Sequence, residues 1–354
     1  MDRSIRRAGA AAAAALALIA LSAAPAFACG GLIGPNGAVN LLRTTTLAGY
    51  HAGAEHYVTA FQFAGGGGAF GSLTPLPGIP SSVEKGGDWT LQRLVRETDP
   101  QPLFLEDAAR AGAAVPASSA EELMKVKIDA LDITVLRGGS EAVGQWATQH
   151  GFRLPPDAPE VLDFYAERSP IFLAAVFDAD AAAQRGQAIG DGTPVHVTIP
   201  TNNPWVPLRI LALGKTAQER VDASVYLLTD GRPALLPAPA DSNGLRLDHF
   251  APASQSLLDD LRSDRSMGWV PTSAWLTKVG IEAAAPDLKF DLAIDASGAN
   301  APSRVMAGLD MPGAAVAPDR TLDNLRLVVG VLLAVGGIGG ILLLLRPRRP
   351  MKMA

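Results

Sequence analysis

An unbroken apolar segment near the C-terminus constrains this chain more than any other feature. Every side chain from residue 327 to residue 345 is apolar or glycine. Nineteen helical residues at ~1.5 Å each match the ~30 Å hydrocarbon core of a bilayer, so we predict a transmembrane helix over residues 325–345. Four basic residues follow it: Arg346, Arg348, Arg349 and Lys352. This basic cluster predicts that the tail, residues 346–354, is cytoplasmic.

The N-terminus has the three parts of a secretory signal peptide. Three arginines open it: Arg3, Arg6 and Arg7. An Ala- and Leu-rich stretch follows, and a small-x-small site ends at Ala28. We therefore predict a signal peptide over residues 1–28, cleaved between Ala28 and Cys29. An uncleaved signal anchor and twin-arginine export are the alternatives. With the signal removed, this is a single-pass membrane protein whose N-terminal domain is extracytoplasmic.

Cys29 is the only cysteine of the chain. A single cysteine cannot form an internal disulfide, so the exported domain is expected to depend on its hydrophobic core. Ordinary cleavage leaves Cys29 as a free thiol, available for an intermolecular disulfide. Lipid attachment to Cys29 is the alternative, although Ala26 and Phe27 are not the large and small residues preferred at those positions.

The exported part of the chain is acidic. The whole chain carries −5, the first 28 residues +2 and the last nine +4, which leaves −11 for residues 29–345. Such a domain has no general attraction for nucleic acid or for anionic lipid headgroups. We therefore predict the membrane bilayer and an envelope molecule as partners, and no nucleic acid.

The chain between the signal peptide and the apolar segment is long enough to bury a large core. Patterns typical of strands and of helices alternate along it. We therefore predict an α+β domain over residues 29–298, with a mixed or antiparallel sheet and short helices. One domain and two closely packed domains both fit. Residues 299–324 are rich in Pro and Ala and predict a flexible stalk.

Residue spacing locates the individual elements. Helices are predicted over residues 89–97, 140–150, 159–167 and 255–262. Strands are predicted over residues 57–63, 128–136, 171–177, 195–199, 208–213, 224–228 and 288–294. Residues 74–80 contain three prolines and are predicted to be an edge or a crossing loop. Trp205, in a second proline-rich turn, either packs inward or lies on a recognition surface.

Motifs that carry enzyme chemistry are mostly absent. His51 and His56 do not have the spacing of a zinc-binding helix and are predicted to lie in a loop. His196 alternates with apolar neighbours and is predicted at a surface or sheet edge, and His150 at a helix C-terminus. No Gly-x-Ser-x-Gly motif or phosphate loop occurs. We therefore assign no catalytic, cofactor-binding or metal-binding residues.

Gly336 and Gly340 stand four residues apart in the predicted membrane helix. This spacing lets two membrane helices approach closely, so one interpretation is homo-association through this face. The other is that glycine is simply common in membrane helices.

Several segments taken in order resemble a known family. They are Cys29-Gly30-Gly31, residues 70–80 followed by 89–94, residues 128–136, 142–146, 150–155, 171–177 and 207–210, and residues 274–277 ahead of Phe290. Together they are similar to the bacterial family of domain of unknown function 2330, over most of residues 29–295. The resemblance implies an exported, often membrane-anchored protein and supplies no catalytic residues. Some members carry a second cysteine soon after Cys-Gly-Gly, where this chain has Leu32-Ile33-Gly34.

These observations predict a binding, scaffolding or envelope-associated role at the cell surface. The alternative is a hydrolase that acts on envelope material without a recognisable catalytic motif. A sensory role would depend on a partner, because a tail of nine residues holds no signalling domain.

Overall fold

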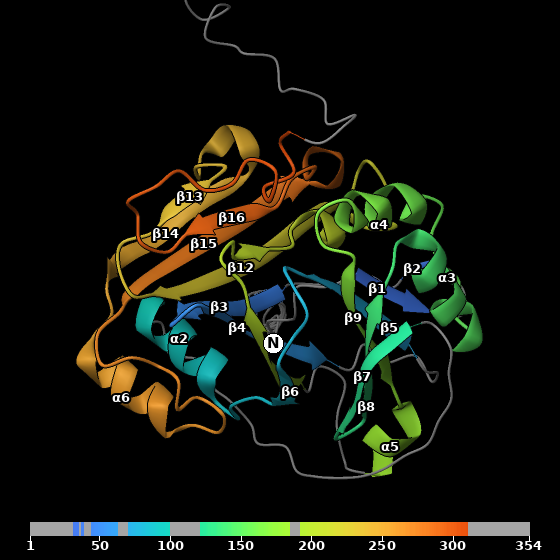
Figure 1. The fold of residues 1–354 in the computed structure, drawn as a ribbon, viewed down its shortest axis with the longest axis horizontal. Coiled ribbons are helices and arrows are strands. Elements are labelled where there is room, and N and C mark those ends of the chain that lie inside the picture. Colours follow the sequence, from blue (N-terminus) through green and yellow to red (C-terminus); the bar gives the residue numbers. More distant parts are fainter. Residues whose placement is uncertain are drawn as a thin grey trace, which may run out of the picture. The chain divides into compact units, whose positions relative to one another are not determined.

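The computed structural model describes residues 31–34, 37–38, 44–62, 70–99, 121–184 and 192–310. The chain divides into two units, residues 1–311 and 312–354, and all described residues belong to the first. Two large sheets, one small sheet and several short helices form this unit (Figure 1). The predicted α+β class, with mixed and antiparallel pairing, is confirmed.

The first sheet is antiparallel throughout, in the strand order β2-β1-β5-β9-β8-β7. Its strands are β1 (Gly31–Gly34), β2 (Gly37–Ala38), β5 (Phe70–Leu76), β7 (Glu121–Ile128), β8 (Leu131–Arg137) and β9 (Ile171–Phe177). The strand predicted over residues 171–177 coincides with β9. The strand predicted over residues 128–136 is wrong at its start, because a turn at Asp129, with φ 53°, separates β7 from β8.

Strand β5 corrects the interpretation of the proline-rich segment. Residues 74–76 belong to β5, which lies between β1 and β9 inside the sheet. β1 pairs with β5 only from Gly71 to Leu73, so Pro75 lies beyond this pairing. A proline is tolerated there because no ladder to β1 continues at that position.

The second sheet has seven strands in the order β14-β15-β12-β3-β4-β10-β6. Its strands are β3 (Thr44–His51), β4 (Ala54–Gln62), β6 (Ser82–Lys85), β10 (Gly192–Pro200), β12 (Arg220–Thr229), β14 (Leu245–Pro252) and β15 (Trp275–Ala284). β12 and β3 pair in parallel, and the other neighbours are antiparallel. The strands predicted over residues 57–63, 195–199 and 224–228 fall within or largely overlap β4, β10 and β12.

The third sheet joins β11 (Trp205–Val206), β16 (Leu292–Asp295) and β13 (Ala234–Leu236). The final strand, predicted over residues 288–294, is β16 and begins later than expected. The strand predicted over residues 208–213 is wrong, because these residues form the 3-10 helix η1 (Arg209–Ala212). The carboxylate of Asp291 accepts the N–H groups of Leu208 and Arg209, which favours a turn over an extended strand here.

The helices are short. They are α2 (Thr90–Thr98), α3 (Ser140–Gln149), α4 (Ala158–Ala166), α5 (Ala179–Gln184) and α6 (Gln255–Ser263), with the 3-10 turns η2 (Asp241–Asn243) and η3 (Ala285–Asp287). Of these, α2, α3, α4 and α6 lie close to their predicted positions, whereas α5 was not predicted. Ser254 caps α6, since its side chain accepts the N–H of Leu257.

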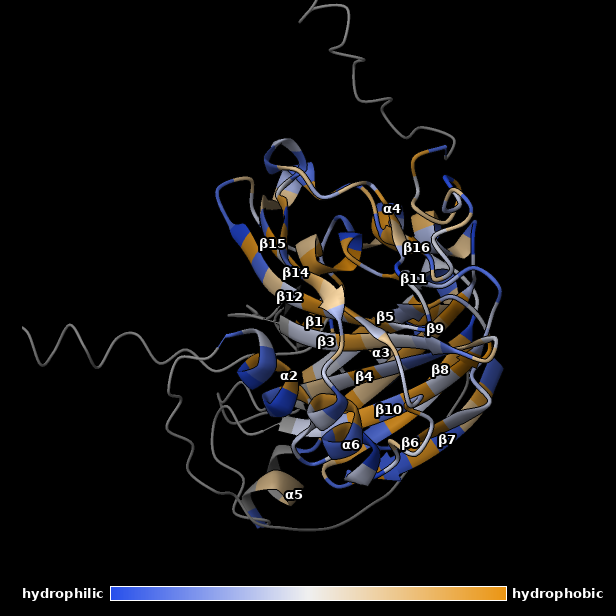
Figure 2. Ribbon diagram, turned by 90° about the vertical axis from the view of Figure 1, so that its left-hand side faces the viewer, coloured by the Kyte–Doolittle hydropathy of each residue, from blue (hydrophilic) through white to orange (hydrophobic). Residues whose placement is uncertain are grey.

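Helices α2 and α6 cover one face of the seven-stranded sheet. Leu94 of α2 and Leu257 of α6 are fully buried and share a hydrophobic cluster with Leu47, Val58 and Tyr226 of the sheet. The outer sides of both helices are largely hydrophilic (Figure 2). This amphipathic pattern explains why the sequence places both helices at nearly the right residues.

The described helices are all too short or too polar to cross a membrane. The predicted membrane helix over residues 325–345 lies outside the described residues, as do the signal peptide, Ala28, Cys29, Gly336 and Gly340. The same holds for the basic tail, with Arg346, Arg348, Arg349 and Lys352. These assignments stay predictions.

Residues 299–310, at the start of the predicted stalk, pack against the domain. Ala307 is fully buried, and its carbonyl accepts the N–H of Asp291 at 3.0 Å. Arg168 also donates to the carbonyl of Met306. The folded unit therefore continues at least twelve residues past residue 298, the predicted domain boundary.

Candidate functional site

Two buried histidines form a pair on the helix-covered face of the seven-stranded sheet. His56 of β4 and His196 of β10 are diagonal neighbours, since Val58 pairs with His196 and His56 with Thr198. Nδ1 of His56 lies 3.0 Å from Nε2 of His196, within hydrogen-bond distance. The two residues are 8% and 2% exposed. The prediction of a loop for His51 and His56 is therefore wrong, and so is the prediction of a surface or edge position for His196.

Strand β6 explains the burial of His196. β6 pairs with the outer side of β10, so β10 is not an edge strand. Glu84 of β6 stands opposite His196, and its Oε1 lies 3.4 Å from Nδ1 of that histidine. A period-two pattern cannot reveal this arrangement, because it gives no information about which strand pairs on either side.

Trp269 covers the histidine pair. Its indole stacks on His56 with ring centroids 4.0 Å apart and an interplanar angle of 2°. The segment that carries it is fixed by Asp264, whose carboxylate accepts the N–H groups of Asp88 and Trp89. Ser266 donates to the carbonyl of Lys85 at 2.9 Å.

The histidine pair is buried and uncharged near neutral pH. Burial, followed by the nearby His196 and His51, lowers the pKa of His56 to about 3. Burial also lowers the pKa of His196, although Glu84 opposes this shift. Both rings are therefore neutral near pH 7, and one nitrogen can donate while the other accepts. A general acid or base has to reach the proton it transfers, and here Trp269 covers one face of His56 while His196 is 2% exposed.

A buried ion pair connects α4, η1 and the segment before β16. Arg168 Nη2 lies 2.5 Å from Asp291 Oδ2, and both side chains are fully buried. Tyr165 donates its hydroxyl hydrogen to Asp291 Oδ1 at 2.9 Å and accepts the N–H of Ile210 at 2.8 Å. Burial, with the negative charge of Asp291, raises the pKa of Tyr165 well above its usual range. The polar groups of this network bond to one another. The network therefore holds these segments together and leaves none of these groups free to bind a ligand.

Glu55 is a buried carboxyl group beside Trp205. Its Oε2 accepts the N–H of Trp205 at 3.2 Å, whereas its Oε1 has no hydrogen-bond partner. Burial raises the pKa of Glu55 to about 8, and the N–H of Trp205 opposes this only partly. The carboxyl is therefore mostly protonated at pH 7. Trp205 itself is fully buried, which decides between its two predicted positions in favour of inward packing.

The remaining candidates have local structural roles. His51 lies at the end of β3, with Nδ1 2.6 Å from Asp230. His150 is the C-cap residue of α3, as predicted, and its Nδ1 lies 2.8 Å from the carbonyl oxygen of Trp146. Across the described ranges, no three His, Cys, Asp or Glu side chains converge in a way that would hold a metal ion.

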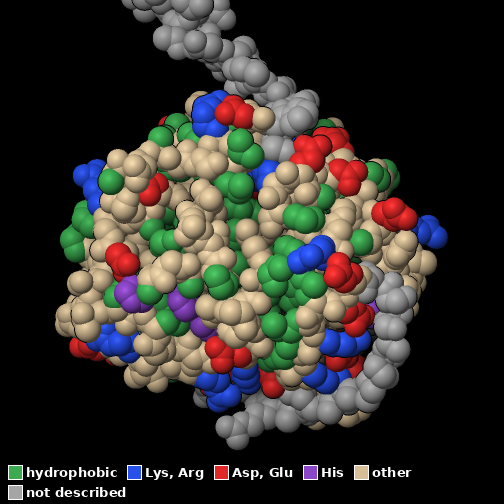
Figure 3. Space-filling view, in the orientation of Figure 1, with side chains coloured by type: hydrophobic (Ala, Val, Ile, Leu, Met, Phe, Trp, Pro, Cys, Tyr) green, Lys and Arg blue, Asp and Glu red, His purple; other side chains and the backbone are tan. Residues whose placement is uncertain are grey.

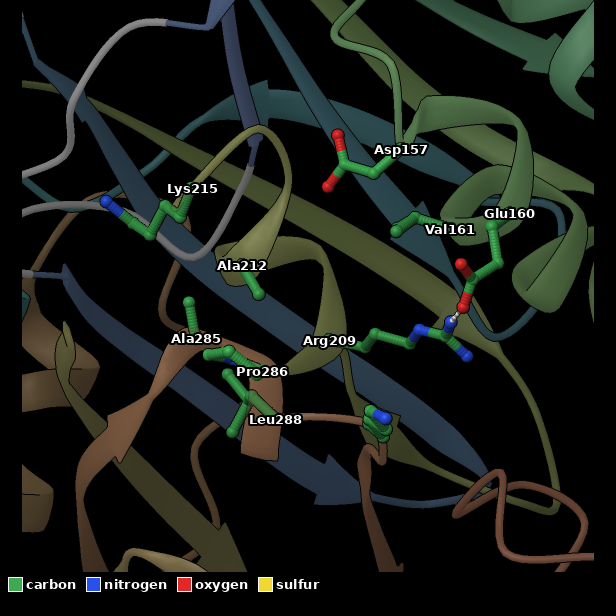
Figure 4. A pocket seen from close by; sticks show the side chains of 10 residues that line it. Asp157, Glu160, Val161, Arg209, Ala212, Lys215, Ala285, Pro286 and Leu288 are labelled. Atoms are coloured by element: carbon green, nitrogen blue, oxygen red, sulfur yellow. Dashed lines mark hydrogen bonds and ion pairs between the residues drawn. The ribbon is translucent and has the colours of Figure 1, made fainter. Parts of the chain in front are cut away.

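A small open cavity lies between α4, η1 and η3 (Figure 4). Its volume is about 140 Å³. Ala285, Pro286 and Leu288 form an apolar wall on one side. Charged side chains of both signs complete the lining: Asp157, Glu160, Arg209, Lys215 and Lys289.

The charged side chains of the cavity have separate partners. Its guanidinium donates through Nη2 to Glu160 Oε1, and it lies 4.2 Å above the ring of Phe164. Asp157 accepts the N–H of Gly214 with both carboxylate oxygens, at 3.1 and 3.0 Å. Lys215 is only 9% exposed, and its Nζ lies 3.9 Å from Glu219 Oε1.

Sequence reasoning missed this cavity. Its residues come from three segments that show no shared motif: the start of α4, the turn η1 and the turn η3. The run of residues 208–213 was expected to be a strand, and a strand would not have placed Arg209 and Ala212 beside one another in a turn.

These features define a sheet-rich α+β domain with buried polar networks and a small charged cavity. The chain belongs to the family described as uncharacterized protein conserved in bacteria, domain of unknown function 2330, which matches residues 23–301. The resemblance noted in the sequence is thereby confirmed.

Structural comparison finds baculovirus P35 among solved proteins. A mutated P35 after caspase cleavage, at 2.7 Å resolution, is 9% identical, with a TM-score of 0.39 over 72% of this chain and 99% of that chain. Another crystal structure of baculovirus P35 gives 10% identity and a TM-score of 0.36, over 72% of this chain and 96% of that one. P35 bound to caspase-8 gives 10% and 0.33, over 73% and 93%. Scores this low carry no information on function. No curated protein matches the chain.

Proposed function

We propose that the protein is an extracytoplasmic binding domain, held close to the outer face of a membrane by its C-terminal segment. The observation that carries the proposal is the charged cavity between α4, η1 and η3. It brings charged side chains and an apolar wall together in one place, where a ligand can make both polar and apolar contacts.

The pairing of buried polar groups with one another is consistent with a binding role for the surface. Arg168 and Asp291 satisfy each other, and His56 and His196 are stacked beneath Trp269. These groups stabilise the domain and leave its surface to interact. Acidic and basic side chains are interspersed over the face shown in Figure 3, so recognition there would depend on local geometry more than on a broad electrostatic field.

The predicted topology supplies the location. A signal peptide over residues 1–28 and an apolar segment over residues 325–345 would leave the described domain outside the membrane, with Arg346 and Arg348 inside. A hydrolase acting on envelope material is the weaker alternative, because the histidine pair that most resembles catalytic machinery is covered by Trp269.

Protease treatment of intact spheroplasts tests the location. We expect added protease to remove the domain while an epitope placed after Lys352 survives, and permeabilised cells to lose the epitope as well. Protection of the whole chain in intact spheroplasts would overturn the proposed topology.

Site-specific photocrosslinking tests the binding role. A photoreactive residue at Lys289 lines the cavity, and one at Lys125 of β7 serves as a matched control. We expect a discrete adduct in cells from position 289 and none from position 125. Equal labelling from both positions, or no adduct at 289, would contradict a ligand at the cavity.

A further inference from the structure

We infer that the cavity between α4, η1 and η3 receives one aliphatic side chain of a partner protein, and that an acidic residue beside that side chain pairs with Lys289. The inference rests on the proposed binding role of the cavity and names the chemistry of its partner. The inserted side chain would be the anchor of the contact, as single buried side chains are in many protein interfaces.

The size of the cavity limits what can enter it. Its volume is about 140 Å³, well below the ~300–1,000 Å³ of typical ligand pockets. An engineered apolar cavity of ~150 Å³ holds one benzene molecule. The cavity of this domain therefore fits one side chain of the size of leucine, and not a whole sugar or nucleotide.

The parts of the cavity lining that are held most firmly are apolar. Val161 of α4 and Leu288 after η3 are only 6% and 1% exposed. Ala212 of η1 and Ala285 of η3 add two short side chains, and Pro286 is exposed at the solvent side. Close-packed side chains such as Val161 and Leu288 move little, so they offer a fixed apolar surface to an incoming group.

Most charged side chains around the cavity are already engaged. Arg209 donates to Glu160, and Lys215 Nζ lies 3.9 Å from Glu219 Oε1. Both oxygens of Asp157 accept a backbone N–H. Figure 4 shows Arg209 and Lys215 directed to opposite sides of the cavity. A charged ligand group would have to break these pairs, whereas an aliphatic side chain leaves them in place as a polar rim around an apolar contact.

Lys289 is the exception among the charged residues of the lining. It is exposed directly after Leu288, and no carboxylate of the described residues forms an ion pair with it. A carboxylate next to the inserted side chain would therefore find a complementary charge at the edge of the apolar wall. Such a pair sets the orientation and choice of a partner more than its affinity.

The test uses the full-length chain in lipid nanodiscs, where no detergent competes for the apolar wall. Three capped dipeptides are titrated as probes: N-acetyl-Leu-Glu-amide, N-acetyl-Ala-Glu-amide and N-acetyl-Leu-Lys-amide. Methyl NMR signals of Val161 and Leu288 report binding at the cavity. The methyl signals of Val126 on β7, outside the cavity lining, are the control.

We expect the Leu-Glu peptide to shift the signals of Val161 and Leu288 saturably and to leave Val126 unchanged. The Ala-Glu peptide should bind about tenfold more weakly, because it buries fewer carbon atoms in the cavity. The Leu-Lys peptide should bind about two- to fivefold more weakly than the Leu-Glu peptide, which is the range of an exposed ion pair.

Two variants separate the apolar contact from the charge. Ala212→Leu fills the cavity and should abolish the shifts produced by the Leu-Glu peptide. Lys289→Glu should reverse the preference, so that the Leu-Lys peptide binds more tightly than the Leu-Glu peptide. Lys125→Glu on β7 is the matched charge control and should leave both affinities unchanged. Because Lys289 is exposed, its variant tests the inference even if Ala212→Leu does not fold.

Three results would overturn the inference: no saturable shift at Val161 and Leu288, equal affinities for the Leu-Glu and Ala-Glu peptides, or an unchanged charge preference in Lys289→Glu. These outcomes are separate from those of the proposed function. A crosslinked partner at position 289 without a preference for leucine would keep the binding role and remove the aliphatic anchor. Leucine-dependent binding by the purified chain does not depend on where the protein is located.

Discussion

The imidazole of His56 lies flat against the indole of Trp269, with 4.0 Å between the ring centroids and 2° between the planes. The contact is made possible by Gly49 of β3, where a Cβ atom would come within 2.0 Å of the Trp269 ring. The β3–β4 hairpin, strand β10 and the segment after α6 are far apart in the sequence and meet at the histidine pair. This contact joins the segment after α6 to the seven-stranded sheet.

Replacing Gly49 with alanine tests this contact. We expect Gly49→Ala to displace Trp269 and to lower the free energy of unfolding by about 1–3 kcal/mol, the usual cost of overpacking. Urea unfolding followed by tryptophan fluorescence measures both effects. Gly268→Ala is the matched control, because a Cβ atom there meets nothing within 4 Å. Equal effects of the two substitutions would contradict the assigned role of Gly49.

The histidine pair predicts a loss of stability in mild acid. The pKa of His56 is about 3 in the folded protein and 6.5 in the unfolded chain, so the unfolded chain binds more protons as the pH falls from 6.5 towards 3. Above pH 6.5 His56 is neutral in both states, and its effect on stability no longer changes with pH. By pH 5 the free energy of unfolding is lower by about 2 kcal/mol.

His56→Phe keeps an aromatic ring beneath Trp269 and removes the titrating group. We expect the variant to be less stable than the wild type at pH 7, because the bond to His196 is lost. That difference should shrink by about 2 kcal/mol between pH 7 and pH 5. Urea unfolding at both pH values measures it. A constant difference would show that His56 is not the group responsible.

Glu55 predicts the opposite pH dependence. The pKa of its carboxyl is about 8 in the folded protein and 4.5 in the unfolded chain, so the folded protein binds more protons between these values. Stability from this group is therefore greatest below pH 4.5 and is lost as the pH rises towards 8. The free energy of unfolding of Glu55→Gln should not fall in this way. Relative to the wild type, the variant should therefore gain on the order of 3 kcal/mol between pH 4 and pH 7.5.

Differential scanning calorimetry across this pH range measures the Glu55 effect. Glu160→Gln is the control, since it changes the same residue type at an exposed position. If the two variants show the same pH dependence, a buried protonated Glu55 is the wrong explanation.

The Arg168–Asp291 pair predicts a large loss of stability when one of its two side chains is removed. Asp291→Ala leaves the buried guanidinium of Arg168 unpaired, as well as the N–H groups of Leu208 and Arg209. We expect a loss of about 3–5 kcal/mol of unfolding free energy. Asp310→Ala breaks the exposed pair with Arg304 and should have little effect. Similar losses from both would mean that the buried pair is not a critical link.

The glycine pair of the predicted membrane helix is testable in the same full-length chain. Gly336→Leu with Gly340→Leu should reduce detergent crosslinking to dimers if the two helices approach through this face. Unchanged crosslinking would remove homo-association through these glycines from consideration.

Local patterns were sufficient to locate the amphipathic helices and the strands that are buried on both faces. The helical spacing of Leu94 and Leu257 reflects the single face that each helix buries, and the apolar run of β9 reflects burial on both faces. The pattern failed at residues 208–213, where the Asp291 carboxylate, more than seventy positions further along the chain, stabilises a turn. It also failed for His196, whose burial depends on β6 and Trp269.

The α+β class, the family and the placement of most helices could be predicted from residue order and spacing alone, because they depend on patterns within a few turns of chain. The sequence also carries the predicted signal peptide and membrane helix, since insertion depends on an uninterrupted apolar length. Which polar groups are buried and which are exposed became clear from the folded structure. The pairing of His56 with His196, the protonated Glu55 and the cavity around Arg209 each require segments that no local pattern connects, because burial and electrostatic environment are properties of neighbours in space.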